Sequence, residues 1–321
     1  MDREMDREAI ALRRLDGLIW TMVALVAAIV LVAPVVSHFR IEWHTFIAPV
    51  VTCSLLLAAG WFYRRRRPDP RLASGAICTA QVIAFAAAGA PLSYLAASAD
   101  LPLYDHALDA IDRALGLDWK GLLSWMNASP VIYDVLRPIY LSLTLQMTTV
   151  VLCLAFSGRL IWLRVYTLAF FLAALISIAI SAVLPAAGVW PYYALTAADS
   201  PHILPAVSTS WPVFDALRDG TFRSLVAVGS EGIITFPSLH AALAVIVIAA
   251  LWPIPILRWV ALALNAAMLV ATPIDGSHYF IDVRAGVVLA ALCLVAASRI
   301  AQAVQRDAPA VAVLVPHLAG K

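Results

Sequence analysis

Residues 159–184 read RLIWLRVYTLAFFLAALISIAISAVL, and the only charged side chains in this run, Arg159 and Arg164, lie near its start. A helix needs about 20 mostly apolar residues to cross the hydrocarbon core of a bilayer. A chain in lipid must also satisfy its backbone hydrogen bonds within the protein, which a helix does by itself. The run therefore predicts a transmembrane helix.

Seven other apolar runs meet or approach this length. In chain order, the eight predicted spans are 17–36, 44–62, 75–97, 131–156, 159–184, 237–252, 256–274 and 280–302. The sixth and seventh are the weakest, because they are short and only Trp252-Pro253-Ile254-Pro255 separates them. The runs lack the alternation of apolar and polar residues that is typical of a membrane barrel. We therefore predict an all-α, polytopic bundle of about eight transmembrane helices.

The composition of the whole chain agrees with a membrane protein. Of its 321 residues, 63% are hydrophobic and 13% are charged, whereas a soluble domain has about 25% charged residues. The net charge of +2 and the scattered arginines exclude nucleic acid as a partner. All four cysteines lie in apolar runs, so we interpret them as packing residues and expect neither disulfides nor a cysteine metal site.

The distribution of basic residues predicts the orientation, because cytoplasmic loops carry an excess of lysine and arginine. If the N-terminus is cytoplasmic, 15 of the 22 basic residues fall on the cytoplasmic side. The run Arg64–Arg67 is the strongest anchor, and we interpret it as a solvated topology determinant that touches anionic lipid head groups. We predict an integral protein of a bacterial inner membrane, with both termini in the cytoplasm.

This orientation divides the chain into three parts. We predict that residues 1–97 form a cytoplasmic tail and three spans, that residues 98–302 form a core with the other spans, and that residues 303–321 form a disordered cytoplasmic tail. Two long segments of the core, 98–130 and 185–236, lie outside. Loops as long as the second one tend to be lids or binding loops.

The first outer segment contains a predicted amphipathic helix at the membrane surface. Its polar residues, Asp105, His106, Asp109 and Asp112, are interleaved with leucine and isoleucine. We interpret them as the water-facing side of this helix rather than as metal ligands.

The first candidate site is the stretch FPSLH at residues 236–240. Proline is tolerated in the first turn of a helix, so we predict that the sixth helix begins at Pro237. Ser238 and His240 then lie in its first turn, where free N–H groups favour an anion. Both side chains are able to donate a hydrogen bond to a phosphate oxygen there.

The second candidate site is HYFID at residues 278–282. His278 and Asp282 are four residues apart, which places them on one face of the eighth helix near its outer end. A carboxylate in this position holds one ring nitrogen as N–H and leaves the other free to attack. The predicted orientation places both candidate sites on the outer side.

Together, FPSLH and HYFID resemble the motifs of the type 2 phosphatidic acid phosphatase superfamily. The chain resembles in particular the branch of the inositol phosphorylceramide synthases, both in FPSLHA and in LPAAGVWPYY at residues 184–193. The resemblance covers roughly residues 100–300.

The resemblance implies a role for each matching residue. His278 would attack the phosphorus and form a phosphohistidine, while His240 would protonate the leaving oxygen and later activate water or an acceptor alcohol. Asp282 would orient His278, and Ser238 would bind a phosphate oxygen. No metal or other cofactor is implied. The implied substrate is a lipid phosphate or a phospholipid head group, and hydrolysis and transfer to an alcohol such as inositol both remain open.

The chain departs from the superfamily at the positively charged residues. Pro130 stands where the first motif has a lysine, although Arg137-Pro138 follows seven residues later, and Thr272 replaces an arginine before the attacking histidine. Phosphoryl transfer requires positive charge near the phosphate. We predict that it comes from Arg284, Arg137 and Lys120, with Arg218 and Arg223 behind them.

Two other classes of function remain open at this point. One is a metal-dependent membrane hydrolase, with His240, His278 and Asp282 as zinc ligands. The other is a transporter, although the sequence shows no inverted repeat. The partners expected are the lipid substrate and the surrounding membrane lipids, and the sequence leaves the oligomeric state open.

Overall fold

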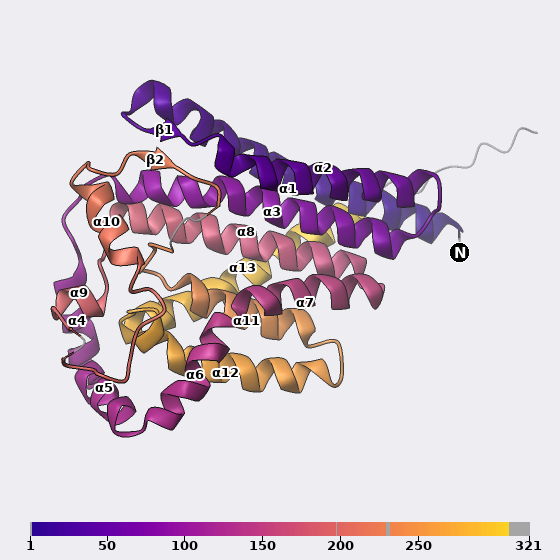
Figure 1. The fold of residues 1–321 in the computed structure, drawn as a ribbon. Coiled ribbons are helices and arrows are strands. Elements are labelled where there is room, and N and C mark those ends of the chain that lie inside the picture. Colours follow the sequence, from indigo (N-terminus) through magenta and orange to yellow (C-terminus); the bar gives the residue numbers. More distant parts are fainter. Residues whose placement is uncertain (1, 197, 229–231, 308–321) are drawn as a thin grey trace, which may run out of the picture.

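The structure, a computed structural model, describes residues 2–196, 198–228 and 232–307 and is helical almost throughout (Figure 1). The elements in chain order are α1 (Asp2–Val36), β1 (Arg40–Ile41), α2 (His44–Arg65), α3 (Pro70–Ala97), α4 (Asp105–Ala114), α5 (Trp119–Ala128), α6 (Pro130–Leu141), α7 (Leu143–Phe156), α8 (Leu160–Val183), α9 (Val189–Tyr192), α10 (Ser210–Arg218), β2 (Ser224–Leu225), α11 (Leu239–Leu251), α12 (Leu257–Asp275) and α13 (Phe280–Arg306).

The long apolar helices confirm the predicted all-α membrane bundle. Within the described residues, six helices are long and apolar enough to cross a membrane, namely α1, α2, α3, α8, α12 and α13. The number rises to seven if α6 and α7 together count as one span. Each of the eight predicted runs corresponds to a helix or a helix pair, but two of them differ from a straight span.

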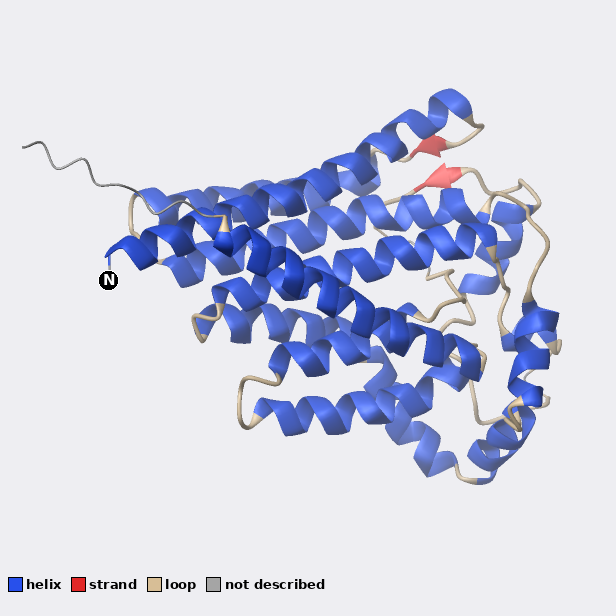
Figure 2. Cartoon of the chain, turned by 180° about the vertical axis from the view of Figure 1, so that it is seen from behind, coloured by secondary structure: helices blue, strands red, loops and turns tan. Residues whose placement is uncertain are grey.

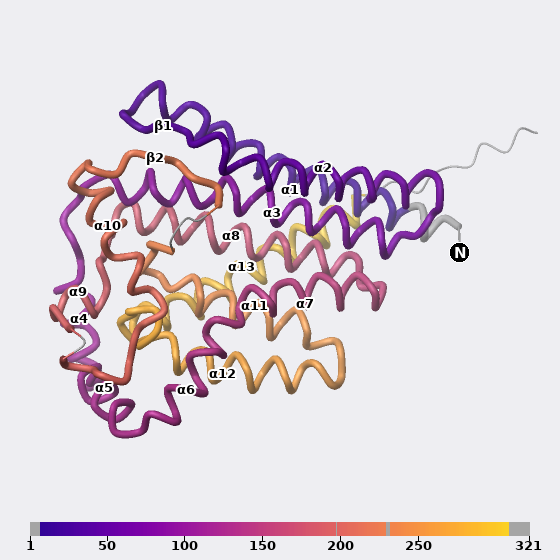
Figure 3. Tube along the Cα trace, in the orientation of Figure 1, coloured from indigo at the N-terminus to yellow at the C-terminus, as the bar shows by residue number. Residues whose placement is uncertain are grey.

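The predicted span 131–156 is broken. Helices α6 and α7 meet at an angle of 48°, and the change of direction is visible in Figure 3. Pro138 in α6 has no N–H to donate to the preceding turn, which weakens the helix just before the break. At the break, the Ser142 hydroxyl donates to the Ile139 carbonyl at 2.6 Å.

The predicted span 237–252 is shorter than expected. Helix α11 has 13 residues, which corresponds to a length of about 20 Å. The hydrocarbon core is about 30 Å thick. Helix α11 is therefore too short to cross a bilayer alone.

The connections gather at two ends of the bundle. Helices α4, α5, α9 and α10 and the strand pair lie at the end opposite the N-terminus (Figures 1 and 2). The α2–α3, α7–α8 and α11–α12 turns lie at the other end. There, Arg14 donates to the backbone carbonyl of Asp307 at 3.1 Å, which joins the start of α1 to the end of α13. The described chain therefore begins and ends on one side of the bundle.

Helices α1 and α3 share a core with the rest of the bundle. Phe85 of α3 stacks on Phe171 of α8, with ring centroids 3.9 Å apart, and Leu15 and Ile19 of α1 belong to the same buried cluster. At the other end, β1 pairs in parallel with β2, with Arg40 opposite Ser224. The α1–α2 connection is thus tied to the long segment 185–236, predicted to lie outside, which holds α9, α10 and β2.

A buried ion-pair network corrects the interpretation of Arg64. Arg164 is fully buried, and its Nε lies 3.0 Å from Oδ1 of Asp16. Arg64 Nη2 lies 2.7 Å from Oδ2 of the same carboxylate. Arg64 is therefore not only a solvated residue of the arginine run, because it also neutralises Asp16 together with Arg164. A buried charge is stable only when it is paired. Because the three paired residues come from α1, α2 and α8, the network holds these helices together.

The predicted C-terminal tail, 303–321, begins as helix, because α13 continues to Arg306. Residues 308–321 of this tail lie outside the described residues.

Candidate active site

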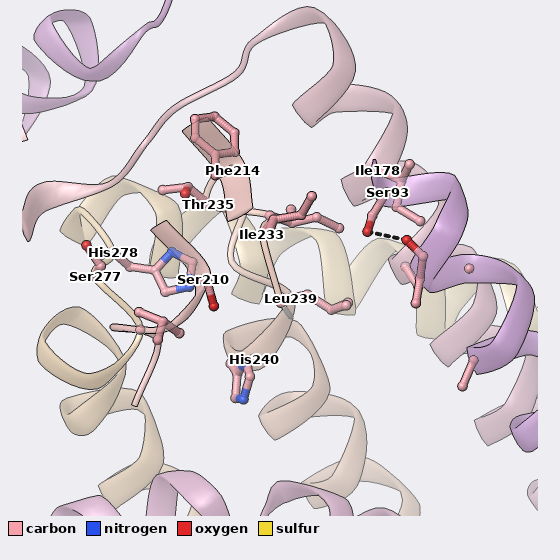
Figure 4. Close-up of a pocket in the computed structure, with 18 of the residues that line it drawn as sticks. Ser93, Ile178, Ser210, Phe214, Ile233, Thr235, Leu239, His240, Ser277 and His278 are labelled. Atoms are coloured by element: carbon pink, nitrogen blue, oxygen red, sulfur yellow. Dashed lines mark hydrogen bonds between the residues drawn. The ribbon is translucent and has the colours of Figure 1, made fainter. Parts of the chain in front are cut away.

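Both motif histidines line one cavity of about 300 Å³. Figure 4 shows His240 and His278 pointing into the same space from separate segments of the chain. Helices α3 and α8 form an apolar wall that includes Phe85, Phe170 and Ile178. Helix α10 of the outer segment adds Trp211 and Phe214, together with the hydroxyl of Ser210. The cavity thus has a polar end at the histidines and an apolar remainder.

His278 lies in the turn between α12 and α13 and makes the contact that the sequence predicts. Its Nδ1 lies 3.3 Å from Oδ2 of Asp282, and both side chains are buried. The same carboxylate oxygen accepts a hydrogen bond of 2.8 Å from the Tyr279 N–H. His278 precedes the helix rather than lying on its face, because α13 begins at Phe280. Asp282, in the first turn of α13, reaches back to the histidine and fixes the ring orientation.

Burial sets the protonation state of His278. It lowers the pKa of the imidazole to about 4, and the backbone of Thr235 opposes this shift. An imidazole with a lowered pKa is neutral at neutral pH and keeps a lone pair on one ring nitrogen. His278 therefore has the protonation state that a nucleophile requires.

We expect His278 to remain neutral when ordinary histidines are already protonated. An unperturbed imidazole has a pKa of about 6.5, so it is mostly protonated at about pH 5.5. Nitrogen NMR of protein carrying labelled histidine should show at that pH a neutral imidazole signal that is missing from His278→Asn. A signal of His278 that titrates near 6.5 would contradict a desolvated site.

His240 lies in the first turn of α11, but the start of this helix differs from the prediction. The helix begins at Leu239, with Ser238 as its N-cap, so Pro237 lies outside it. The Ser238 hydroxyl accepts a hydrogen bond of 3.3 Å from the Ala241 N–H. Ser238 is fully buried and is not among the residues that line the cavity. Its hydroxyl caps the helix, and its predicted contact with phosphate remains a prediction.

The two candidate segments touch where α13 crosses the start of α11. The Ser238 N–H donates to the Asp282 carbonyl at 3.1 Å. One turn later, Gly286 lies against the backbone of α11. A Cβ atom there would stand 3.2 Å from the Ala242 nitrogen, 3.0 Å from the Ala241 Cβ, and closer still to the Ser238 carbonyl. The absence of a side chain at Gly286 thus fixes how closely the two histidine-bearing segments approach.

We expect Gly286→Ala to reduce both stability and turnover. Its Cβ meets backbone atoms that cannot move alone, and such overpacking costs about 1–3 kcal/mol. Gly17→Ala in α1 is the matched control, because nothing lies within 4 Å of a Cβ at that helical glycine. Thermal unfolding in detergent and initial rates should separate the two variants. Equal stability of Gly286→Ala and wild type would contradict this contact.

The acidic residues of α4 are not a water-facing surface, so that interpretation is wrong. Asp105, Asp109 and Asp112 are each at most 4% exposed, whereas His106 is exposed. Ile111 and Leu115 lie on the exposed side instead, at 43% and 52%. The helix is turned the opposite way because its carboxylates find backbone donors inside the protein.

These carboxylates hold the segments that carry the candidate site. Asp105 accepts hydrogen bonds from the Ala187 and Gly188 N–H groups, at 2.9 and 2.8 Å. Asp112 accepts from the Phe280 and Ile281 N–H groups at the start of α13, at 2.6 and 2.9 Å. Burial raises the pKa of Asp112, and these two donors oppose the shift. Through these hydrogen bonds, helix α4 joins residues 187 and 188 to the start of α13, next to the turn that carries His278.

The sequence does contain a signal that the three carboxylates of α4 act together. Residues 105, 109 and 112 follow the i, i+4, i+7 spacing of a single helix face. The apolar residues between them lie on other faces, so a solvated surface was not the only arrangement that the pattern allowed. What the sequence does not show is the partner, because the backbone N–H groups of residues 187, 188, 280 and 281 are distant in the chain.

The predicted cationic residues are not brought to the histidines. Arg284 is exposed and lies near Asp112, and the Lys120 ammonium lies 4.3 Å from the centre of the Tyr193 ring. Arg137 donates to the Leu204 carbonyl at 2.8 Å. Arg218 and Arg223 bind backbone carbonyls of residues 101 and 217. Among the described residues that line the cavity, none is lysine or arginine, and the role of these cations in binding substrate remains a prediction.

The three proposed zinc ligands do not form a metal-binding group. Within residues 2–196, 198–228 and 232–307, no cluster of three histidine, cysteine, aspartate or glutamate side chains is arranged to hold a metal ion. Asp282 is instead engaged by the Tyr279 N–H and by His278.

Comparison with known proteins adds one match. A sequence profile of the PAP2 superfamily matches residues 106–296, which is more than half of the chain. The matched region begins in α4 and contains both histidines, but it leaves out α1, α2 and α3. Helix α3 nevertheless forms part of the cavity wall. No match was found to a curated protein or to a solved structure.

Proposed function

Since the chain belongs to the PAP2 superfamily, we propose that it acts on a lipid phosphate or a phospholipid head group through a phosphohistidine intermediate. The supporting observation is the cavity, which combines two histidines from separate segments with an apolar wall. The polar end suits a phosphate, and the wall formed by α3 and α8 suits the acyl part of the same molecule.

The proposed reaction has two steps. In the first, the His278 ring nitrogen that does not face Asp282 attacks phosphorus, a P–N bond forms, and the P–O bond to the leaving group breaks. His240 donates a proton to the leaving oxygen. In the second, His240 removes a proton from water or an alcohol, whose oxygen attacks phosphorus while the P–N bond breaks. Asp282 stabilises the charge on His278 in both steps, as an orienting carboxylate does in a catalytic triad.

The proposed reaction takes place near the outer surface of a bacterial inner membrane. The start of α11 and the α12–α13 turn, which carry the histidines, lie toward the end of the bundle that carries α4, α5, α9 and α10, opposite the start of α1 (Figure 1). The excess of arginine at the other end supports a cytoplasmic location for both termini. A lipid in the outer leaflet would then reach the cavity without crossing the membrane.

Transfer of a head group to an alcohol is the second candidate, as in the inositol phosphorylceramide synthase branch that the chain resembles. The specific observation in its favour is that the described lining of the cavity contains no lysine or arginine. A phosphodiester carries one negative charge, whereas a phosphomonoester carries nearly two at neutral pH. A cavity without cations therefore favours a diester substrate.

Purified protein in detergent or nanodiscs tests the proposal with a panel of phosphatidic acid, a sphingoid base phosphate and phosphatidylinositol. Each lipid is assayed with and without an acceptor alcohol, and in the presence of a chelator. Release of inorganic phosphate indicates hydrolysis, and formation of a new phospholipid indicates transfer. Activity should survive the chelator. Activity that a chelator abolishes and added zinc restores would contradict metal independence, and failure to turn over any of the lipids would contradict the proposed function.

A further inference from the structure

Tyr140 lies against the candidate site without having been singled out by any sequence motif. It is the last but one residue of α6, and it is 2% exposed. Its ring stacks on the imidazole of His240, with centroids 4.3 Å apart and an angle of 9° between the planes. Tyr140 also lines the cavity together with His240 and His278.

The hydroxyl of Tyr140 has no hydrogen-bond partner among the described residues. Other buried tyrosines do have partners: the Tyr279 hydroxyl donates to Asp105 at 2.9 Å, and the Tyr133 hydroxyl donates to the Leu204 carbonyl at 2.5 Å. A buried hydroxyl without a partner is unfavourable, so such a group calls for an explanation. A ligand that binds in the cavity would supply one.

Gly276 shows which part of the cavity the hydroxyl faces. A Cβ atom on this glycine would stand 2.9 Å from the Tyr140 oxygen and 2.5 Å from Cδ2 of His278. The hydroxyl and the His278 ring therefore border the same small space, while the Tyr140 ring touches His240. The tyrosine thus touches His240 and, like His278, lies next to Gly276.

The proposed chemistry favours a hydrogen-bond donor at this position. Phosphoryl transfer places developing negative charge on the non-bridging oxygens, and fixed hydrogen-bond donors stabilise it. The described cavity residues include no lysine or arginine that would supply this stabilisation. A tyrosine hydroxyl is a neutral donor, and in a site of low polarity it acts more strongly than it would in water.

We propose that Tyr140 is a catalytic residue whose hydroxyl donates a hydrogen bond to a non-bridging oxygen of the phosphoryl group under attack by His278. This inference rests on the proposed function. It assigns to one neutral side chain part of the stabilisation that cations provide at other phosphoryl-transfer sites.

Tyr140→Phe tests the inference, because it removes the hydroxyl and keeps the ring that stacks on His240. Loss of one such donor lowers kcat by about 10²–10³-fold. Tyr166→Phe is the matched control: Tyr166 is equally buried, but its hydroxyl contacts the Met147 carbonyl at 3.5 Å, and the residue does not line the cavity. We expect Tyr166→Phe to stay within about threefold of wild type.

Vanadate provides a readout that a merely structural role would not change. It mimics the phosphorus with its surrounding oxygens, so its inhibition constant should rise in Tyr140→Phe and remain unchanged in Tyr166→Phe. If Tyr140→Phe unfolds, a protein with 3-fluorotyrosine at position 140 is measured in its place. The fluorine keeps the shape of the side chain and makes its hydroxyl a stronger acid. If the hydroxyl binds the phosphoryl group, this change in acidity should change kcat.

The outcomes separate the inference from the proposed function. If wild type turns over a lipid of the panel but Tyr140→Phe matches Tyr166→Phe in kcat and in vanadate inhibition, the inference is wrong and the proposed function stands. An unchanged kcat with 3-fluorotyrosine at position 140 would likewise contradict the inference and leave the proposed function standing. If wild type turns over none of the lipids, the proposed function itself fails.

Discussion

Replacing His278 with asparagine is expected to reduce turnover by at least about 10⁴-fold, since removal of a catalytic nucleophile has effects of this size or larger. The asparagine amide is able to keep a hydrogen bond to Asp282, so the turn before α13 should keep its conformation. Initial rates on the best lipid of the panel provide the measurement. His106→Asn is the control, because His106 lies exposed on α4 and outside the cavity lining.

The size of this effect decides between a nucleophile and a packing residue. A variant of His278 that keeps wild-type stability and retains more than about a tenth of the activity would contradict the nucleophilic role. His106→Asn should match wild type in both respects.

Replacing Asp282 with asparagine is expected to lower kcat by about 10³–10⁴-fold, as loss of the orienting carboxylate does in a catalytic triad. The amide removes the negative charge that stabilises a positively charged His278, and it allows the wrong tautomer of the ring. The contact of 3.3 Å between Asp282 and His278 carries this expectation. Stopped assays with a high enzyme concentration are needed, because the residual rate is small.

Asp112→Asn distinguishes orientation of the histidine from capping of the helix. Asp112, like Asp282, accepts backbone N–H groups at the start of α13, but its partners are the N–H groups of Phe280 and Ile281, whereas Asp282 also faces the His278 ring. We expect Asp112→Asn to lower the melting temperature and to keep kcat within about tenfold of wild type. Equal losses of kcat in the two variants would indicate that Asp282 acts only as a cap.

The membrane fold was predictable because it depends on long apolar runs, which are a local property of the chain. Each of the eight runs became a helix or a helix pair, and the ends of α2, α3 and α8 lie close to the predicted bounds. The break at Ser142 and the late start of α11 were not predicted. Both depend on hydrogen bonds of individual side chains, and hydropathy does not include such bonds.

The central pair of the candidate site was also predictable, since His278 and Asp282 are close in sequence and their spacing nearly fixes the contact. The acidic face of α4 was misread for the opposite reason. Asp105 and Asp112 bind N–H groups that lie far away in the chain, and only the fold brings them together. The same holds for Tyr140, which reaches His240 across two helices.

The position of α3 shows that the cavity extends beyond the region that matches the superfamily. The superfamily match begins at residue 106, yet Phe85, Gly89 and Ser93 of α3 line the cavity. Because this wall consists mostly of apolar side chains and a glycine, it would contact the acyl part of a substrate rather than its phosphate. Differences in lipid preference between this chain and other superfamily members are therefore expected to depend on α3.

The most direct test of the proposed chemistry is to trap the covalent intermediate. In His240→Asn, an activated aryl phosphate still allows attack by His278, because its leaving group needs no proton, but the second step lacks its base. Mass spectrometry of the quenched protein should then find the phosphoryl group on His278, and the adduct should be absent from a variant that also carries His278→Asn. If wild type turns over its substrate but His240→Asn carries no adduct on His278, or carries it on another residue, the proposed phosphohistidine is contradicted.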